Sequence, residues 1–115
     1  MLRMAIVATA LLFPAIAQAK TSCVTASWYG PGFHNRMTAN GEKYNQFGIS
    51  AAHKTMRFGT KVKLTNRKNG KSVVVRINDR GPYIKGRSFD LSRHAAYRIG
   101  MLEDGKACVK VEIVK

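Results

Sequence analysis

Two aspartates in this sequence each lie at the boundary of an expected structural element. The chain of 115 residues has only six acidic residues against 20 lysines and arginines. Asp79 ends the apolar run "VVVRIND", Asp90 starts "DLSRHAAYRIG" eleven residues later, and Glu42 lies in "TANGEKY". Because cleavage of a glycosidic bond needs only one or two well-placed carboxyl groups, these three acids are candidates for acid-base chemistry.

Each of these acids also has a structural interpretation. Asp79 continues the inward alternation of the strand before it, and a salt bridge with Arg76 or Arg80 would account for its charge. Asp90 is suited to satisfying the free backbone donors at a helix N-terminus. Glu42 could be a solvated loop charge. The sequence leaves these alternatives open.

Other kinds of chemistry find little support in the sequence. His34 and His94 have no partner pattern, and the histidines and cysteines lack the spacing of metal ligands. There is no G-x-S-x-G motif and no phosphate-binding glycine loop. We therefore expect no metal and no cofactor.

The elements that must position the acids are mainly strands. The alternating segment "CVTASWYG" predicts a first strand, and residues 49–53 predict a short second one. Between them, residues 31–48 are rich in Gly, Asn and Pro and predict a long loop, which in a compact domain is usually functional. Residues 59–66 and 71–79 predict a β-hairpin, because both residues of the Asn69-Gly70 pair between them tolerate positive φ.

A short helix and a last strand complete the expected fold. Ser92 is a suitable N-cap and Gly100 a suitable stop, with an apolar stripe between them. Residues 105–114 predict the last strand. If the first and last strands pair, the sheet closes into a barrel with no exposed edges.

The two cysteines, Cys23 and Cys108, lie near the two ends of the expected domain. Pairing of the first and last strands would bring them together, and an exported protein favours a disulfide over two free thiols or a catalytic cysteine. A bridge that closes so long a loop contributes on the order of 4 kcal/mol in the entropic model.

Residues 1–19 predict a secretory signal peptide. They have an arginine near the start, an apolar stretch and small residues at Ala17 and Ala19, and the stretch is too short for a membrane span. An uncleaved anchor is the alternative. Lysine at position 20 argues against lipidation of Cys23. We expect a single domain, residues 20–115, that is exported to the periplasm or the exterior without a lipid anchor.

The net charge of the chain indicates an acidic partner. The formal charge is +14, and removal of Arg3 with the signal peptide leaves +13. Nucleic acid, anionic lipid and a cell-wall polymer all fit this charge, and export makes nucleic acid the poorest of them. A basic surface with no specific target is the alternative.

Three long motifs together resemble the rare lipoprotein A (RlpA) family. They are "ASWYGPGFHNRMTANGEKY", "SAAHKTMRFGTKVKLTNRKNGKSVVVRINDRGPY" and "GRSFDLSRHAAYRIGM". The resemblance implies a mainly β fold, a six-stranded double-psi β-barrel with one or two short helices. It also implies a lytic transglycosylase that cleaves peptidoglycan between N-acetylmuramic acid and N-acetylglucosamine, preferring strands without stem peptides and leaving 1,6-anhydro ends.

The resemblance assigns roles to individual residues. Glu42, His53 and Asp79 match the acid of T-A-N-G-E, the histidine of A-A-H and the acid of N-D-R-G-P. Asp90 matches the acid of D-L-S, which lies in the substrate groove of related barrels. We expect Asp79 to be the acid/base, assisted by the other two, and the remaining expected substrate-binding residues are Trp28, Tyr29, Arg80 and Tyr83, whose rings could stack on sugars.

Two other functions remain open at this point. A non-catalytic, expansin-like wall-binding or wall-loosening module would explain the charge and the aromatic residues equally well. A secreted cationic toxin would need an amphipathic basic helix, and the expected helix is short. The leading prediction is a monomeric enzyme that acts on peptidoglycan glycan strands, with neither a nucleic acid partner nor a membrane span.

Overall fold

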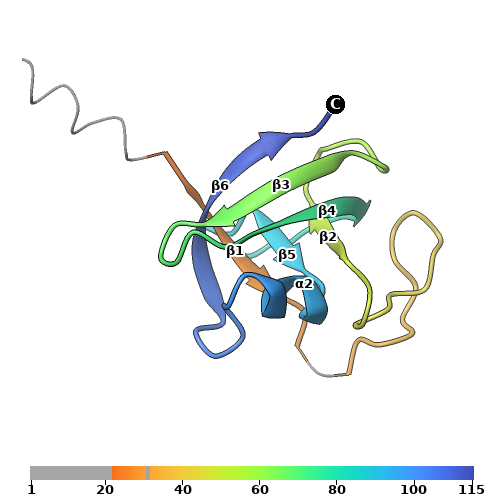
Figure 1. The fold of residues 1–115 in the computed structure, drawn as a ribbon. Helices are drawn as coiled ribbons and strands as arrows, with labels where there is room; N and C mark the ends of the chain where they lie inside the picture. Colours follow the sequence, from red (N-terminus) through yellow and green to blue (C-terminus); the bar gives the residue numbers. More distant parts are fainter. Residues whose placement is uncertain (1–21, 31) are drawn as a thin grey trace, which may run out of the picture.

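The computed structural model describes residues 22–30 and 32–115, so the expected signal peptide lies outside the described residues. Six strands close into a barrel in the order β1-β5-β2-β4-β3-β6 (Figure 1). This confirms the expected mainly β barrel. The strands are β1 (Val24–Trp28), β2 (Ser50–His53), β3 (Lys61–Asn66), β4 (Ser72–Asp79), β5 (Phe89–Leu91) and β6 (Lys106–Ile113).

The barrel closes where its first and last strands pair. β1 is antiparallel to β6, with Thr25 opposite Cys108, and the expected Cys23–Cys108 disulfide joins the residue before β1 to β6. The other neighbour of β1 is β5, which runs parallel to it, and β2 and β4 form a second parallel pair. Parallel neighbours need long crossover connections, so residues far apart in sequence meet at the same end of the barrel.

The predicted hairpin is confirmed, with one difference in its turn. β3 and β4 are antiparallel, with Thr65 opposite Ser72. Gly70 has a positive φ of 78°, whereas Asn69 is not among the residues with positive φ. The buried Asn66 starts the turn, and its amide donates to the carbonyl oxygen of Ile99 at 2.8 Å. The hairpin is therefore fixed to the end of the helix as well as by its own turn.

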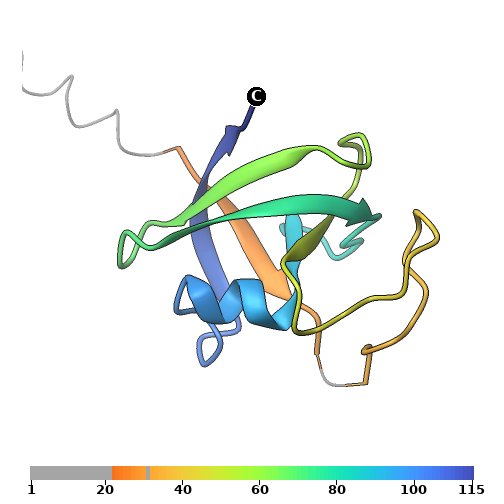
Figure 2. The ribbon, with the colours of Figure 1, turned by 45° about the vertical axis from the view of Figure 1, so that its right-hand side comes forward.

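The described residues contain one short helix, α2 (Arg93–Arg98). Its N-cap is Ser92, as expected, and the Ser92 hydroxyl accepts a hydrogen bond from the backbone N–H of Ala95. The buried side of the helix packs into a core made by inward residues of all six strands. Figure 2 shows α2 across the lower end of the barrel.

The long loop, residues 32–49, lies on the opposite side of the barrel from the β3–β4 turn in both ribbon views (Figures 1 and 2). Its middle is folded on itself as a small hairpin, with Met37 paired to Lys43 and the Thr38 N–H bonded to the carbonyl oxygen of Glu42. The loop is therefore an ordered part of the structure, and it meets the barrel at the end of β4.

Candidate active site

Asp79 lies at the point where a β-bulge changes the direction of side chains on β4. On β2, Ala51 pairs with Ile77, but the next residue, Ala52, pairs with Asp79 rather than Asn78. One extra residue in β4 turns Asp79 to the opposite face from the buried Ile77. The expectation that Asp79 continues the inward row is wrong for this reason, and its side chain is half-buried beside the long loop.

Three donors hold the Asp79 carboxyl group in place. The Tyr29 hydroxyl donates to Oδ2 at 2.7 Å, and the backbone N–H groups of Ala39 and Arg80 donate to Oδ1 at 2.8 and 2.9 Å. These donors come from the end of β1, the long loop and the residue after β4. Within residues 22–30 and 32–115, Asp79 makes no salt bridge, so the expected alternative of an Arg76 or Arg80 pair is not seen.

Asp90 lies two strands away from Asp79 on the same side of the sheet. Ala52 of β2 pairs with Asp79 on one side and with Asp90 of β5 on the other. The two carboxyl groups therefore flank a residue whose side chain is a single methyl group. Ser27, opposite Asp90 on β1, donates from its hydroxyl to Asp90 Oδ1 at 3.0 Å.

The surroundings of Asp90 favour its neutral form. Burial raises the pKa of the Asp90 carboxyl group, and the nearby charge of Asp79 raises it further. The hydrogen bond from Ser27 and the charge of Arg87 oppose this rise. The side chain of Asp90 does not cap the helix, because Ser92 holds that position. Asp90 is thus available to the pocket rather than committed to the helix N-terminus.

Both aspartates line a pocket of about 250 Å³. Its wall combines aromatic rings, carboxyl groups and two arginines, a mixture that suits sugar rings with polar substituents. The residues lining it are Tyr29, Phe33, Arg36, Met37, Thr38, Tyr44, Asp79, Arg80 and Asp90.

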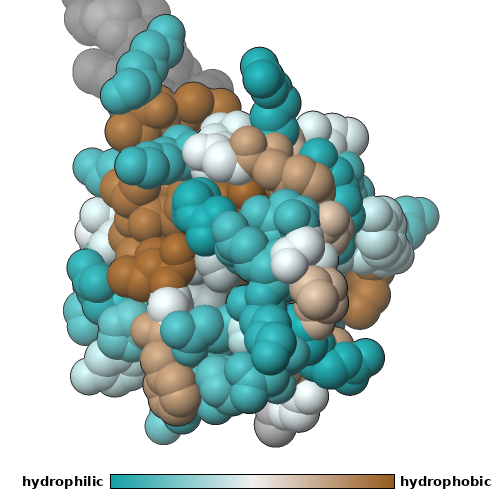
Figure 3. Space-filling view, turned by 90° about the vertical axis from the view of Figure 1, so that its right-hand side faces the viewer, coloured by the Kyte–Doolittle hydropathy of each residue, from teal (hydrophilic) through white to brown (hydrophobic). Residues whose placement is uncertain are grey.

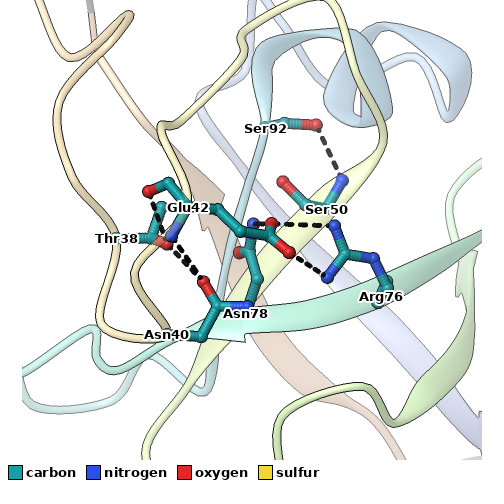
Figure 4. Close-up of polar contacts among 7 residues, drawn as sticks. All are labelled: Thr38, Asn40, Glu42, Ser50, Arg76, Asn78 and Ser92. Atoms are coloured by element: carbon teal, nitrogen blue, oxygen red, sulfur yellow. Dashed lines mark hydrogen bonds and ion pairs between the residues drawn. The ribbon is translucent and has the colours of Figure 1, made fainter.

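Glu42 is held beside this pocket by a bidentate ion pair. Arg76 donates from Nη1 and Nη2 to the two carboxylate oxygens at 2.9 Å each, and the Asn78 amide donates to Oε1 at 3.1 Å (Figure 4). The hydrogen bonds from Arg76, then Asn78, lower the pKa of Glu42 to about 2. The group stays ionised near neutral pH, so it is not a proton donor there; it is a partly exposed loop charge with a fixed partner.

His53, at the end of β2, is built into a turn beside the pocket rather than into its wall. Its Nδ1 accepts hydrogen bonds from the backbone N–H groups of Thr55 and Met56. Its ring lies 4.8 Å, centroid to centroid, from that of Phe89. Burial, followed by the charges of Arg80 and Lys54, lowers the pKa of the imidazole, which favours its neutral form.

The structure brings only some of the other expected residues to the pocket. Tyr29 and Arg80 line it. The Arg80 guanidinium lies 4.0 Å above the Phe58 ring centroid and donates to the Met56 carbonyl oxygen at 2.8 Å. Trp28 packs against the core, and Tyr83, although 76% exposed, is not part of the pocket wall.

Five residues of the pocket wall were not predicted individually. All lie in the long loop: Phe33, Arg36, Met37, Thr38 and Tyr44. Tyr44 is buried, and its ring meets Tyr29 edge to face with centroids 4.4 Å apart. Its hydroxyl accepts a hydrogen bond from the Arg93 N–H. The only sequence signal was the loop itself, whose length marked it as functional without indicating which side chains face inward.

The side of the molecule that carries the long loop is mostly hydrophilic at its centre, with apolar residues gathered toward one edge (Figure 3). Among the described residues, no group of three His, Cys, Asp or Glu side chains is arranged to hold a metal ion. In the same part of the chain, no helix has the length and apolar character needed to cross a membrane.

The fold and the pocket define a class: a double-psi β-barrel domain with paired carboxyl groups in an aromatic-lined pocket. Residues 21–111 match the family model described as "Lytic transglycolase", and the chain belongs to this family. This agrees with the resemblance to RlpA proteins seen in the sequence motifs.

Curated relatives carry RlpA names. The chain is 60% identical over 90 residues to a "Probable endolytic peptidoglycan transglycosylase RlpA" of Synechocystis sp., covering 78% of this chain and 28% of that protein. It is 48% identical over 99 residues to the "Endolytic peptidoglycan transglycosylase RlpA" of Campylobacter jejuni, with coverage of 86% and 36%. The chain thus spans only about a third of the length of these relatives.

Solved structures support the same fold. A "Streptomyces papain inhibitor (SPI)" aligns with a TM-score of 0.64 at 17% identity, over 82% of this chain and 94% of that one. A Clavibacter michiganensis expansin in complex with cellohexaose also aligns with a TM-score of 0.64, at 18% identity, over 82% of this chain and 50% of the expansin. At these identities the likeness concerns the fold alone.

Proposed function

We propose that this barrel is an endolytic peptidoglycan lytic transglycosylase domain. It would cleave the bond from N-acetylmuramic acid to N-acetylglucosamine and leave 1,6-anhydro-N-acetylmuramic acid ends. The observation that carries the proposal is the placement of Asp79 and Asp90 on either side of Ala52 within one aromatic-lined pocket. Membership of the family and the names of the relatives support the same activity.

The chemistry needs a proton donor and a proton acceptor but no water. A carboxyl group protonates the glycosidic oxygen as its bond to the anomeric carbon breaks. The muramic acid 6-hydroxyl then attacks that carbon, and the proton it loses passes to the carboxylate. The products are the anhydro sugar and a new 4-hydroxyl, so atoms and protons balance.

We assign the acid/base role to Asp79, because three fixed donors set its position. The raised pKa of Asp90 makes this residue a second proton carrier in the pocket, in addition to its role in substrate binding. Glu42 assists through orientation: its ion pair with Arg76 joins the loop to the strand that ends in Asp79. His53 assists in the same indirect way, by fixing the turn after β2.

The sugar-binding roles follow the pocket wall. Tyr29 and Phe33 stack at the pocket wall and could contact sugar faces, and the buried Tyr44 supports Tyr29 through an edge-to-face contact. Arg80 contributes charge at the wall. The wider expectations, export to the periplasm or beyond and a monomeric state without a lipid anchor, are consistent with a wall substrate and belong to the same proposal.

Incubation of the purified protein with peptide-free glycan strands, read by mass spectrometry, tests this function. Fragments with anhydro ends are expected from the wild type. Asp79→Asn should lower the cleavage rate by roughly 100-fold or more, whereas Glu112→Gln, a change at an exposed position of β6, should leave it unchanged. Ordinary reducing ends would indicate hydrolysis, and retained binding without cleavage would favour a wall-binding module instead.

A further inference from the structure

Two arginines line the pocket and a third, Arg76, holds the adjoining loop, and their guanidinium groups differ in what they contact. Arg76 is neutralised by Glu42 through two hydrogen bonds. Arg80 is stacked over the Phe58 ring and donates to a backbone carbonyl. The guanidinium of Arg36, which is exposed at the pocket wall, makes no hydrogen bond or ion pair with any residue in the ranges 22–30 and 32–115.

The backbone of Arg36 is nevertheless fixed. Its N–H bonds to the carbonyl oxygen of Phe33 at 2.9 Å, closing a turn in which Asn35 has a φ of 72°. Asparagine is one of the few residues that tolerates this conformation. Two further bonds, from the Tyr44 N–H to the Arg36 carbonyl and from the Asn35 N–H to the Tyr44 carbonyl, tie the turn to the other arm of the loop.

The side chain of Arg36 is also partly ordered. Its guanidinium carbon lies 5.5 Å from the centroid of the Phe33 ring, which leaves the planar fork of donors free at its edge. A guanidinium with its donors free and its backbone fixed is well suited to bidentate binding of a carboxylate. The negative charge of Asp79, at the same pocket, would repel a carboxylate from its own side.

We propose that Arg36 binds the lactyl carboxylate of muramic acid and selects glycan in which that group is free. The inference rests on the proposed function, since it takes the pocket to hold a peptidoglycan strand. Muramic acid carries one carboxyl group, on its lactyl ether. The group is an anion when no stem peptide is attached and a neutral amide when one is. Arg36 therefore distinguishes the two forms and sets the orientation of the strand relative to Asp79.

The test compares peptide-free glycan strands with the same strands after their lactyl carboxyl groups have been converted to methylamides. Cleavage is measured as kcat/KM, and binding is measured separately with the Asp79→Asn variant. The wild type is expected to prefer the free carboxylate by roughly 10- to 100-fold, the range for a hydrogen bond to a charged group. Arg36→Gln should bring this ratio close to one, and Arg36→Lys should keep part of it.

Arg98→Gln is the matched control. It removes the same charge from an exposed residue that lines a different pocket, beside the β3–β4 turn, so the ratio should stay at the wild-type value. Thermal unfolding of each variant checks that the fold is intact. An Arg36→Gln ratio equal to that of the wild type, or a wild type without preference, would overturn the inference.

Failure of the proposed function gives a different result. If the wild type cleaves neither substrate but binding by Asp79→Asn still depends on the free carboxylate and on Arg36, the domain is a wall-binding module and the inference holds. If neither substrate is bound, the inference is overturned as well. A ratio that falls equally in Arg36→Gln and Arg98→Gln would indicate a general effect of net charge, and it would also refute a specific role for Arg36.

Discussion

Asp79 and Asp90 are linked through a single residue, since both pair with Ala52 from neighbouring strands. Adjacent strands lie 4.7–4.9 Å apart, so the backbones of the two aspartates are separated by roughly 10 Å with only a methyl group between them. The bulge in β4 creates this arrangement by turning Asp79 away from the core. Ala52 itself is buried, so its methyl group sets the spacing of the two aspartates that line the pocket without lining the pocket itself.

This arrangement predicts that Ala52 must stay small. Ala52→Val adds two methyl groups between the carboxyl groups, and we expect it to lower kcat/KM for glycan strands by at least tenfold while costing about 1–3 kcal/mol of stability. Ala52→Ser should have smaller effects on both kcat/KM and stability. Kinetics and chemical denaturation of the two variants provide the check. Full activity in Ala52→Val would mean that catalysis does not depend on the spacing that Ala52 sets between the two carboxyl groups.

The ion pair between Glu42 and Arg76 is expected to matter more for activity than for stability. Both side chains are 41% exposed, so the net free energy of the pair is about 1 kcal/mol or less. Glu42→Gln should nevertheless free the loop that carries the pocket wall, raising amide hydrogen exchange at Ala39 and lowering kcat/KM. Glu103→Gln, in an exposed turn, is the control. Unchanged exchange and activity in Glu42→Gln would contradict this positioning role.

The same pair gives a defined pH dependence of stability. The pKa of Glu42 is about 2 in the folded protein against 4.5 as the ordinary value, so the folded state holds the ionised form more strongly. The contribution of the Glu42–Arg76 pair to the free energy of unfolding is fully present above about pH 5 and is lost as the pH falls toward 2. The difference in unfolding free energy between wild type and Glu42→Gln should shrink over this window. A difference that is constant with pH would exclude the effect.

Ionisation of Asp90 is predicted to affect stability in the opposite direction, by destabilising the folded state as the pH rises. Burial raises its folded-state pKa above the ordinary value of 3.8, so ionisation destabilises the folded state once the pH exceeds that value. Asp90→Asn keeps an oxygen for the Ser27 hydroxyl and removes the charge, so it should raise Tm at pH 7 and have little effect well below pH 4. The same variant should bind or cleave glycan less well. A lower Tm at pH 7 would show that the charge of Asp90 is stabilising.

The disulfide is expected to stabilise the barrel without affecting the pocket. It joins residues 85 positions apart, and loop-closure entropy assigns such a bridge about 4 kcal/mol. The double variant Cys23→Ala and Cys108→Ala should lose a free energy of unfolding of this size in urea. At temperatures where it remains folded, it should cleave or bind glycan as the wild type does, because neither cysteine lines the pocket. A selective loss of activity would point to coupling between the two regions.

Local patterns in the sequence were sufficient for most of the secondary structure. The hairpin at Gly70, the Ser92 cap and the presence of the first and last strands depend on neighbouring residues, and the structure confirms each of them. The cysteines could be paired because the strands that carry them had to meet for the sheet to close. Family motifs added the barrel topology, which local periodicity does not determine.

The tertiary structure alone decided how the acids are used. Local pattern placed Asp79 in the inward row of its strand and left a solvated loop charge open for Glu42, because alternation and loop composition carry no information about a bulge or a distant partner. Long-range contacts made the difference: an extra residue in β4 reverses the face of Asp79, Arg76 lowers the pKa of Glu42, and burial raises the pKa of Asp90. Pairing between strands and burial act across the chain, so the chemistry of each carboxyl group is set only once the barrel has closed.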